Sequence, residues 1–424
     1  MALRGTLTVP GDKSITHRAI ILSALAEGEA VITGYCPGED CLHTARAFQA
    51  LGVPIDIGPD HMRITGKGLR SLREPESVVD CGNSGTGIRL LTGVLAGQDF
   101  FSVLTGDGSV RRRPMGRVVG PLREMGALIA GRSGGEFAPL AITGTRLRGI
   151  AYRSPIASAQ VKSCVLLAGL FAKGTTSVTE PALSRDHTER LFGYLGIPLT
   201  RHGLTVSFAG QRSFEAKDIP VAGDLSAAAF FLVGASLVPD SDVTVTGVGV
   251  NPTRTGILDV LREMGARIDL VNPRVQAGEQ VADLRVRSAP LRGVAIGPGR
   301  IPQTIDEFPI LCVAAACAHG ETVISGAREL RVKESDRIAT MAEELRRMGA
   351  EVEERADGMR IVGGRPLKGA LCRSHGDHRV AMSMTIAGLV ASGETKIDDT
   401  ACVATSFPGF DKKLRGLLTP SGQG

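Results

Sequence analysis

The sequence DHRVAMSMTIAGLVASGETK, residues 377–396, begins with charged residues, continues with small and apolar ones and breaks at Gly393. A helix that is apolar on nearly every side belongs in the interior of a domain, so we expect only its first turn to be polar. The same pattern recurs five times, at intervals of 66 to 82 residues. Such repetition predicts copies of one structural unit. The six expected helices begin at Lys13, Ser84, Ser158, Asp224, Asp306 and Asp377, and a short strand follows each.

A second repeated marker lies between these helices. LREMGA occurs at 122–127 and again at 261–266, and related segments occupy 48–53, 192–197 and 345–350. Each is typical of an exposed helix that ends at a C-terminal glycine and leads into a strand. Three of these strands are expected to be followed by a second strand with a shared ending, at 64–66, 142–144 and 361–363.

The repeated unit therefore reads βαβαββ, and six copies predict an α/β protein with two similar domains. Each domain would place three units around its buried helices, like an inside-out α/β barrel. We expect one domain to be continuous, residues 12–224, and the other to join residues 1–11 to residues 225–424. The N-terminal strand, near Gly5–Val9, is expected to complete the sixth unit, which lacks its own hairpin.

The composition favours a small-molecule enzyme. The net charge of the 424 residues is only +5, which suits small anionic substrates better than a nucleic-acid backbone. The eight cysteines show no CxxC pair or zinc-ligand spacing, which indicates reduced thiols in a cytoplasmic protein and no metal site. Uncharged runs are too short for a membrane span, and no signal peptide is expected.

The starts of the six expected helices are candidate anion sites. A helix N-terminus exposes unpaired N–H groups and a partial positive charge. Cations there oppose the helix dipole, so we expect bound anions to compensate them, with several starts facing one cleft. Ser84 and Asp224 are explained equally well as ordinary N-caps. The cations in question are Lys13, Arg18, Arg89, Lys162 and Arg379.

Two charged segments add candidate chemistry. In residues 331–337, RVKESDR, we expect Lys333 and Arg337 to be neighbours on one helix face with Glu334 beside them. A surface helix laced with salt bridges would look similar. Asp306 supplies a second carboxylate, and two carboxylates near cations can divide acid and base roles. In residues 111–113, three arginines before Pro114, we expect the last to hold an anion at the start of an exposed helix.

The ordered set of motifs resembles the 5-enolpyruvylshikimate-3-phosphate synthase family over essentially the whole chain. The motifs are PGDKSITHRA, GNSGTGIRLL, RRRPM, SAQVKS, RVKESDR and GDHRVAM, from residues 10, 82, 111, 158, 331 and 376 onward. The resemblance implies transfer of the enolpyruvyl group of phosphoenolpyruvate to the 5-hydroxyl of shikimate 3-phosphate, with release of phosphate. It implies no cofactor, no metal, no nucleic-acid or membrane partner, and a monomer.

Residue roles follow from the resemblance alone, position by position. Asp306 would be the base for the 5-hydroxyl, Glu334 the acid that protonates the methylene carbon, and Lys13 would assist departure of the phosphate. The residues expected to bind shikimate 3-phosphate are Lys13, Ser14, Arg18, Ser158, Ala159, Gln160, Ser184, Asp306 and Lys333. Those expected to bind phosphoenolpyruvate are Lys13, Gly85, Arg113, Gln160, Arg337 and Arg379.

Some positions depart from other members of the family. Ala159 stands where some carry serine, Thr405 stands where some carry lysine, and differences also surround His187. The nearest alternative is a UDP-N-acetylglucosamine enolpyruvyl transferase. That family has lysine–asparagine near its N-terminus, where Ser14 follows Lys13 here, and usually a loop cysteine, which residues 107–115 lack. An RNA- or phosphate-binding module would also use arginines, but aromatic residues for base stacking are scarce.

Overall fold

The computed structural model describes residues 1–210 and 213–419, which form two compact units. The middle unit consists of Gly11–Ala222 together with Gln276–Glu279. The terminal unit consists of Met1–Pro10, Gly223–Val275 and the chain from Gln280 onward. Within the described residues, no helix has the length and apolar character needed to cross a membrane.

Three buried helices form the centre of the middle unit. They are α1 (Lys13–Leu25), α3 (Gly85–Ala96) and α6 (Ala159–Gly169). Amphipathic helices α2 (Glu39–Ala50), α4 (Gly116–Glu124) and α7 (His187–Tyr194) follow them in turn, and a short helix, α5 (Arg132–Gly135), joins two strands.

Three four-stranded sheets enclose these helices, in the orders β13-β2-β4-β3, β5-β6-β8-β7 and β9-β10-β12-β11. Their strands are β2 (Glu27–Thr33), β3 (Ile55–Ile57), β4 (His61–Lys67), β5 (Val79–Asp80), β6 (Phe101–Thr105), β7 (Leu128–Gly131), β8 (Phe137–Thr143), β9 (Ala151–Arg153), β10 (Thr175–Thr179), β11 (Thr200–His202), β12 (Thr205–Ala209) and β13 (Ile219–Pro220).

The terminal unit repeats this plan. Its buried helices are α8 (Leu225–Leu237), α11 (Phe308–Cys317) and α13 (His378–Gly388), and its amphipathic helices are α9 (Gly256–Glu263), α12 (Arg337–Arg347) and α14 (Phe410–Leu417). The short helix α10 (Ile301–Thr304) precedes α11, and the 3₁₀ turns η3 (Arg328–Val332) and η4 (Ala401–Thr405) precede α12 and α14.

The sheets of the terminal unit have the orders β15-β16-β14-β1-β23, β17-β18-β20-β19 and β21-β22. Their strands are β1 (Ala2–Thr8), β14 (Asp242–Gly249), β15 (Arg267–Gln276), β16 (Glu279–Arg287), β17 (Ala295–Ile296), β18 (Gly320–Ile324), β19 (Glu351–Arg355), β20 (Gly358–Gly363), β21 (Leu371–Cys372), β22 (Lys396–Ile397) and β23 (Leu418–Thr419).

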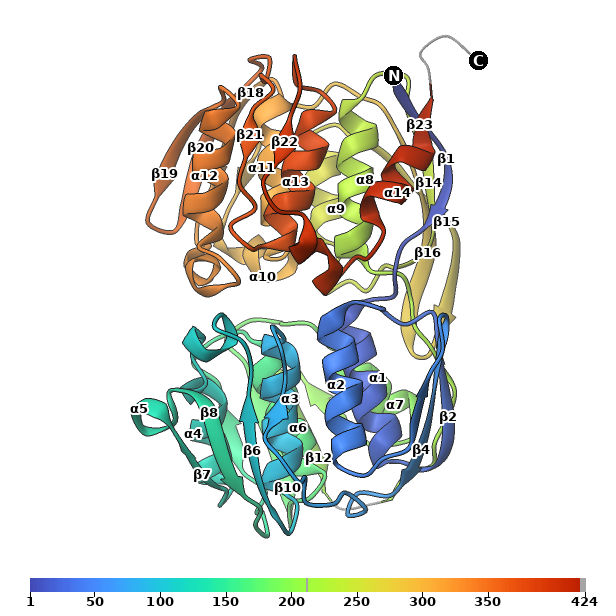
Figure 1. Ribbon diagram of the computed structural model, residues 1–424, viewed down its shortest axis with the longest axis vertical. Coiled ribbons are helices and arrows are strands. Elements are labelled where there is room, and N and C mark those ends of the chain that lie inside the picture. The colour runs from blue at the N-terminus through green and yellow to red at the C-terminus, as the bar shows by residue number, and fades with distance from the viewer. Residues whose placement is uncertain (211–212, 420–424) are drawn as a thin grey trace. The chain divides into compact units, whose positions relative to one another are not determined.

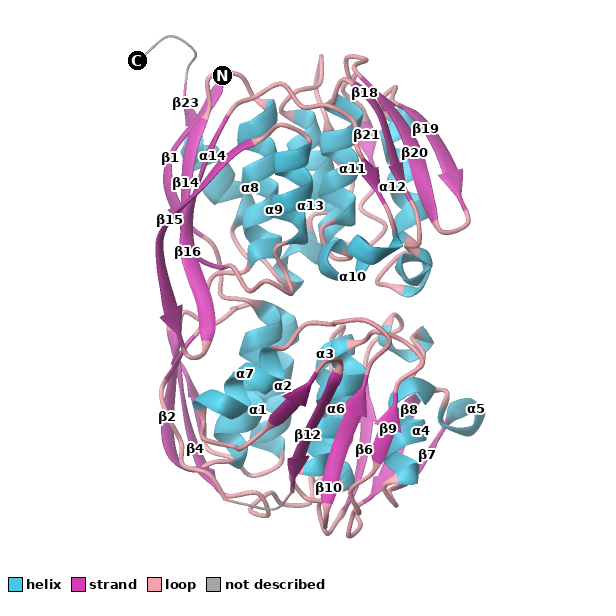
Figure 2. Cartoon of the chain, turned by 180° about the vertical axis from the view of Figure 1, so that it is seen from behind, coloured by secondary structure: helices cyan, strands magenta, loops and turns pink. Residues whose placement is uncertain are grey.

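Figures 1 and 2 show the same layering within each unit, with helices at the centre and sheets outside. The predicted α/β class, with three βαβαββ units around buried helices, is confirmed. The sheets stay separate, so neither unit is a closed barrel. Each unit buries its own hydrophobic core around its three central helices.

The shared strand ending is a packing requirement. A Cβ atom on Gly66 would lie 2.3 Å from the carbonyl oxygen of Ala26, directly after α1. The equivalent distance is 2.1 Å from Gly363 to Ala318, directly after α11. Real Cβ atoms cannot approach a backbone oxygen so closely, so only glycine lets the hairpin pass the end of the buried helix.

The glycines of the second marker also behave as predicted. Gly126 and Gly265, after α4 and α9, have φ angles of 101° and 102°. This left-handed conformation closes the helix and costs glycine little, as the C-cap prediction requires. The matching glycines after α2, α7 and α12 also have positive φ angles; they are Gly52, Gly196 and Gly349.

The N-terminal strand is shared between repeats. As expected, β1 lies beside the end of the sixth unit, where Ala2 and Leu3 pair antiparallel with Thr419 and Leu418 of β23. Its longer pairing, however, is parallel to β14 of the fourth unit. In the middle unit, β13 takes the equivalent place beside β2. The two strands have exchanged partners, because each precedes one buried helix but pairs with the strand that follows another.

Candidate active site

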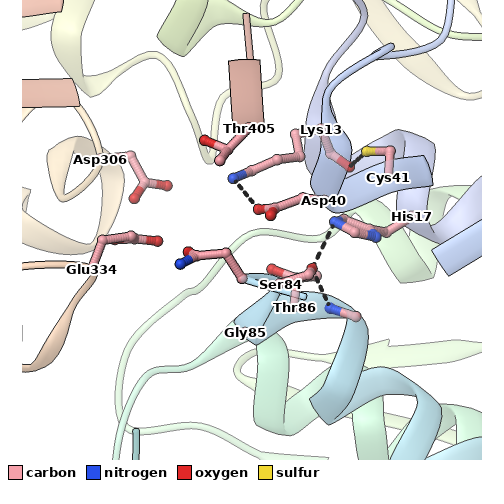
Figure 3. Close-up of polar contacts among 12 residues, drawn as sticks. Lys13, His17, Asp40, Cys41, Ser84, Gly85, Thr86, Asp306, Glu334 and Thr405 are labelled. Atoms are coloured by element: carbon pink, nitrogen blue, oxygen red, sulfur yellow. Dashed lines mark hydrogen bonds and ion pairs between the residues drawn. The ribbon is translucent and has the colours of Figure 1, made fainter. Parts of the chain in front are cut away.

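The starts of the three buried helices in the middle unit are tied together by side chains. His17 of α1 contacts the hydroxyl of Ser84, at the start of α3, at 3.3 Å. Gln160 of α6 donates to Thr86 of α3 at 2.9 Å. These contacts hold the first turns of three helices, far apart in sequence, in one cluster, and Figure 3 shows the contact between His17 and Ser84.

Three side chains cap these helices. Asp12, Ser84 and Ser158 accept the backbone N–H groups of Ile15, Gly87 and Val161, respectively. The N-cap interpretation of Ser84 is therefore correct. Ser158 Oγ is used as an acceptor, and a hydroxyl keeps one O–H to donate to a ligand.

Arg18 points its guanidinium towards α6 and α7. Its Nε donates to Thr188 Oγ1 at 2.7 Å, its Nη1 to the carbonyl of Ser14 at 2.8 Å and its Nη2 to Ser163 Oγ at 2.6 Å. A guanidinium has five N–H donors. Within the described part of the chain two therefore remain, one on each terminal nitrogen, which is the fork that a phosphate accepts.

Lys13 is the first residue of α1 and pairs with Asp40 of α2 at 2.9 Å (Figure 3). Asp40 is buried, so this ion pair fixes the lysine stem against α2. Ser14 follows on the same turn and is half-buried. The predicted substrate residues Lys13, Ser14 and Arg18 thus occupy the first one and a half turns of one helix.

Gly85 and Arg113 depend on each other. A Cβ atom at Gly85 would lie 2.7 Å from Nη1 of Arg113, so a larger residue would displace the guanidinium. Arg113 is buried and donates to Asn83 Oδ1 at 3.0 Å and to Ser109 Oγ at 2.9 Å. The predicted helix follows this segment as α4, but it begins only at Gly116, after a 3₁₀ turn that ends at Arg112, so Arg113 precedes the helix.

Gln160 is oriented at both ends of its amide. Its Oε1 accepts from Arg89 at 2.7 Å, while its Nε2 donates to Thr86. Ala159 beside it is half-buried, as Ser158 is. Ser184 is buried, and its Oγ makes no hydrogen bond to the described residues. The structure therefore brings all three residues of the 158–160 motif to the start of α6.

Lys162 does not have the role expected of a cation at a helix start. Its ammonium group is buried and pairs with Glu180 and Glu189, each at 2.8 Å. The two carboxylates compensate its charge inside the protein, so no bound anion is required. Glu180 also accepts the backbone N–H of Ser158 at 3.1 Å, which fixes the start of α6.

The cations of the middle unit influence one another. Burial, with Lys13 and Arg18 nearby, holds the pKa of His17 well below 6.5, so its ring is neutral at pH 7. Burial lowers the pKa of Arg18 to about 10, and Arg185 acts in the same direction, against Glu189 and Asp12. A bound anion would relieve both effects.

In the terminal unit, three carboxylates surround the guanidinium of Arg337. Its guanidinium contacts Asp377 at 2.8 Å, Glu334 at 2.7 Å and Asp306 at 3.5 Å. Arg337 and Asp377 are 1% and 0% exposed, whereas Glu334 and Asp306 are 17% and 19% exposed. The pair of Arg337 and Asp377 is therefore buried, whereas the carboxylates of Glu334 and Asp306, both labelled in Figure 3, are partly exposed.

These charges shift one another as their signs demand. Burial disfavours the charged form of Arg337, but Asp377, Glu334 and Asp306 outweigh it and raise its pKa. Burial raises the pKa of Asp377, but Arg337 outweighs it and lowers that pKa below 3.8. Lys333 lies near Asp306 and Glu334, and burial lowers its pKa. Arg379 reaches Asp306 at 4.0 Å.

The local structure around Lys333 corrects the sequence interpretation. Lys333 has an extended backbone after the 3₁₀ turn η3, and α12 begins only at Arg337. Lys333 and Arg337 are therefore not neighbours on one helix face. Asp336 is the N-cap and accepts the N–H of Ala339 at 3.0 Å, which ends the loop and starts the helix.

Side chains of the protein itself neutralise the charged groups at the start of α8. Asp224 is the N-cap, as one of the two interpretations held, and it pairs with Arg254 at 3.1 Å. Arg254 also reaches Ser226 at 2.7 Å and Glu307, the residue before α11, at 3.7 Å. This helix start carries none of the predicted substrate residues, and its charges are satisfied internally.

Two further features lie beside the predicted residues. Thr405 ends η4, and its hydroxyl donates to the carbonyl of Cys402 at 2.8 Å, so it supplies no cation. Among the described residues, Glu343, Glu344 and His375 form the one group with metal-ligand spacing. Arg347 pairs with both glutamates of this group, at 2.7 and 3.2 Å.

Sequence reasoning missed the residues that hold the predicted ones in place. Asp40, Asp377 and Thr188 were not assigned such roles, and Arg185 was not singled out. The sequence signals for these residues were weak, because the residues that a buried side chain contacts come from other helices, and the sequence does not show which helices pack together. Asp377 alone had a local signal, since it directly precedes an apolar run as an N-cap does.

The comparisons with known proteins agree over nearly the full length of the chain. The sequence profile of EPSP synthase (3-phosphoshikimate 1-carboxyvinyltransferase) matches residues 1–414. A 3-phosphoshikimate 1-carboxyvinyltransferase from Geobacter sulfurreducens is 57% identical, over 97% of this chain and 96% of the relative. One from Desulforudis audaxviator is 55% identical, over 98% and 97%.

A solved structure leads to the same family. The EPSP synthase from Acinetobacter baumannii, at 2.37 Å, matches with a TM-score of 0.88 and 46% identity, over 98% of this chain and 96% of that one. With that coverage, the match extends into both units. This chain belongs to the EPSP synthase (3-phosphoshikimate 1-carboxyvinyltransferase) family.

Proposed function

We propose that this chain transfers the enolpyruvyl group of phosphoenolpyruvate to the 5-hydroxyl of shikimate 3-phosphate, and that its two units contribute different chemistry. The helix starts of the middle unit would bind the anionic groups of the substrates. The carboxylates around Arg337 would move the protons. The observation that carries this division is the set of two partly exposed carboxylates, Glu334 and Asp306, on one buried guanidinium.

Arg18 is proposed to bind the phosphate ester of shikimate 3-phosphate. Its two remaining donors form a fork, and its lowered pKa marks a buried charge that an anion would stabilise. Lys13, Ser14 and Ser158 add an ammonium group and two hydroxyls from neighbouring helix starts. Ser184 is a further candidate because its buried hydroxyl has no partner among the described residues. Ala159 would contribute backbone contacts.

Phosphoenolpyruvate is proposed to lie against a second set of cations. Arg113 lies across the start of α3, where Gly85 makes room for it. Gln160 is held between Arg89 and Thr86, so its amide is fixed for contact with both substrates. From the terminal unit, Arg337 and Arg379 would add guanidiniums, which suit carboxylate and phosphate groups through paired hydrogen bonds.

Proton transfer is proposed to use Asp306 and Glu334. Asp306 would accept the proton of the 5-hydroxyl while that oxygen attacks C2 of phosphoenolpyruvate. Glu334 would donate a proton to C3, which becomes a methyl group. Return of a proton from that methyl group to the Glu334 carboxylate would then restore the double bond as the C2–O bond to phosphate breaks. Lys333 would hold the ring hydroxyls, and Lys13 would stabilise the departing phosphate.

The function can be tested with two acceptors. Phosphate release from phosphoenolpyruvate is measured with shikimate 3-phosphate and, separately, with UDP-N-acetylglucosamine. We expect turnover only with shikimate 3-phosphate, with 5-enolpyruvylshikimate 3-phosphate as the second product. Turnover with the nucleotide sugar instead would contradict the proposal.

We also propose that the chain works in the cytoplasm as a monomer, on these two small molecules and on no nucleic acid or membrane. The eight cysteines are all free thiols, six of them buried, which supports a reducing compartment. Size-exclusion chromatography with light scattering should give the mass of one 44.4 kDa chain. A mass of about twice that value would contradict the monomer.

A further inference from the structure

The turn of the β15–β16 hairpin lies in an unusual place. Ala277 and Gly278 have φ angles of 47° and 81°, as in a tight two-residue turn of the I′ type. Such turns normally face solvent. Here Ala277 is buried within the hydrophobic core of the middle unit, although the strands on either side belong to the terminal unit. The turn residues 276–279 are called the hairpin turn below.

A buried hydrogen bond holds the hairpin turn on α7. Glu279 Oε1 accepts from His187 Nδ1 at 2.7 Å, and both side chains are only 2% exposed. Arg190, one turn further along α7, donates to the carbonyl of Gly278 at 3.2 Å. A buried carboxylate is costly unless it is paired, so this contact fixes the turn and the helix start against each other.

The next residue on α7 reaches the proposed phosphate site. Thr188 accepts from Arg18 Nε at 2.7 Å and exchanges a hydrogen bond with Ser163 at 2.6 Å. Ser163 also accepts from Arg18 Nη2 at 2.6 Å. One of the three protein contacts that orient the Arg18 guanidinium therefore comes directly from the first turn of α7. A second, from Ser163 of α6, is joined to that turn through the Thr188 hydroxyl.

We propose that Glu279 and His187 are positioning residues for the binding of the phosphate of shikimate 3-phosphate, acting through Thr188 and Arg18. The inference rests on the proposed function, because it assigns a support to the same site. A bidentate contact with phosphate needs both terminal nitrogens of Arg18 in one plane with the ligand oxygens. A small shift of α7 would turn that plane and weaken this substrate alone.

The test compares the two Michaelis constants in variants of the full chain. Glu279→Ala should raise KM for shikimate 3-phosphate about tenfold, while kcat and KM for phosphoenolpyruvate stay within about twofold. Glu279→Gln keeps an oxygen that accepts from His187 and should recover most of the loss. Asp269→Ala removes an exposed ion pair with Arg287 on the same hairpin and should change none of these values.

A double-mutant cycle separates positioning from general damage. Glu279→Ala should add little to the KM of an Arg18→Lys variant, because the residue that it positions has already been lost. If Glu279→Ala does not fold, Thr188→Val removes the acceptor on Arg18 and should give the same selective rise. Equal rises in both KM values, or fully additive effects, would overturn the inference. Absence of turnover in the unmodified chain would instead contradict the proposed function.

Discussion

The helix starts of the two units carry opposite chemistry on the same scaffold. In the middle unit, burial and neighbouring cations hold the pKa of His17 well below 6.5, and burial lowers that of Arg18 to about 10. In the terminal unit, three carboxylates outweigh burial and raise the pKa of Arg337. Added negative charge would therefore be stabilised at the helix starts of the middle unit, whereas in the terminal unit carboxylates already surround a buried cation.

On the proposed function, a repeated fold divides one reaction between its two units. Strand order, C-cap glycines and hairpin endings are shared by the repeats, because they serve packing. The first turn of each buried helix is free to differ, since it is the polar end of an otherwise apolar element. At α8 that end is closed by Arg254 and Glu307, at α13 it holds Arg337, and at α1 it presents two cations. The chemistry thus depends on a few residues per repeat.

The largest expected effect is a loss of kcat without a loss of substrate binding, in a variant of Glu334. Glu334→Gln keeps the shape and a hydrogen bond to Arg337 but cannot donate a proton as a carboxylic acid does. We expect kcat to fall about 10²- to 10⁴-fold, the usual contribution of a general acid. Binding of shikimate 3-phosphate, measured by calorimetry, should change little.

A matched control is Glu343→Gln, which alters a glutamate on α12 that pairs with Arg347. Its kcat should equal that of the unmodified chain. Normal turnover of Glu334→Gln would mean that the acid is another residue and that the terminal unit does not have the role proposed for it.

The second effect concerns stability in the terminal unit. Asp377→Asn leaves Arg337 buried without its closest buried carboxylate, and breaking such a pair costs about 3–5 kcal/mol. Because Arg337 lowers the pKa of Asp377, the pair stabilises the fold above about pH 4, and this contribution is lost as the pH falls through the folded-state pKa. Urea unfolding at pH 7 should detect the loss.

Acid unfolding gives a second readout for Asp377→Asn, since the variant lacks the pH-dependent part of that stabilisation. Glu321→Gln, which breaks an exposed pair with Arg360, serves as the comparison and should cost much less stability, because solvent screens an exposed pair. Equal stability losses in both variants would show that the network around Arg337 is no different from a surface ion pair.

A third, smaller effect is expected in the middle unit. Arg18→Lys keeps the charge but loses the fork and the Nε donor to Thr188. We expect KM for shikimate 3-phosphate to rise about 10- to 100-fold, the cost of one or two charged hydrogen bonds, with kcat nearly unchanged. Steady-state kinetics should show this, with Arg46→Lys on the exposed face of α2 as the control. A fall in kcat alone would contradict a binding role for this unit.

The smallest effect is a pH dependence of stability. The unfolded chain protonates His17 near pH 6.5, whereas the folded chain does so only at a lower pH, because of burial and the nearby cations. Stability from this group is therefore complete above about pH 6.5 and declines as the pH falls. His17→Gln should reduce the loss of unfolding free energy between pH 6.5 and 5 by about 1 kcal/mol. If the unfolding free energy of His17→Gln and of the unmodified chain fell equally with pH, the lowered pKa of His17 would be contradicted.

The architecture was largely predictable because packing leaves regular marks. Six buried helices were recognisable from their apolar runs, and five of them begin within one residue of the predicted start. Helix α11 begins at Phe308, two residues after Asp306. Glu307 is the residue before the helix, and Pro309 occupies the first turn, where proline is tolerated. The assignment of the two units as enolpyruvyl-transferase domains stays a prediction, as do the individual substrate contacts.

The supporting contacts could not be read from the sequence. The charged segment 331–337 was wrongly predicted to be one helix. Its N-cap, Asp336, lies inside the segment, so the helix starts only after Lys333. Nothing in the sequence predicts that the turn at Ala277 is buried in the core of the middle unit. Such contacts join residues that are about 30 to 170 positions apart, and no local pattern reports them.

The exchanged strand β1 has a consequence for how the protein is made. It is synthesised long before either of its partners, because its parallel partner β14 begins at Asp242 and its antiparallel partner β23 begins at Leu418. During synthesis, residues 11–222 can collapse while β1 is still unpaired. An unpaired strand edge is prone to aggregation. The exposed polar and charged residues Arg4, Thr6 and Thr8 on this strand would keep the unpaired edge soluble until β14 and β23 have been synthesised.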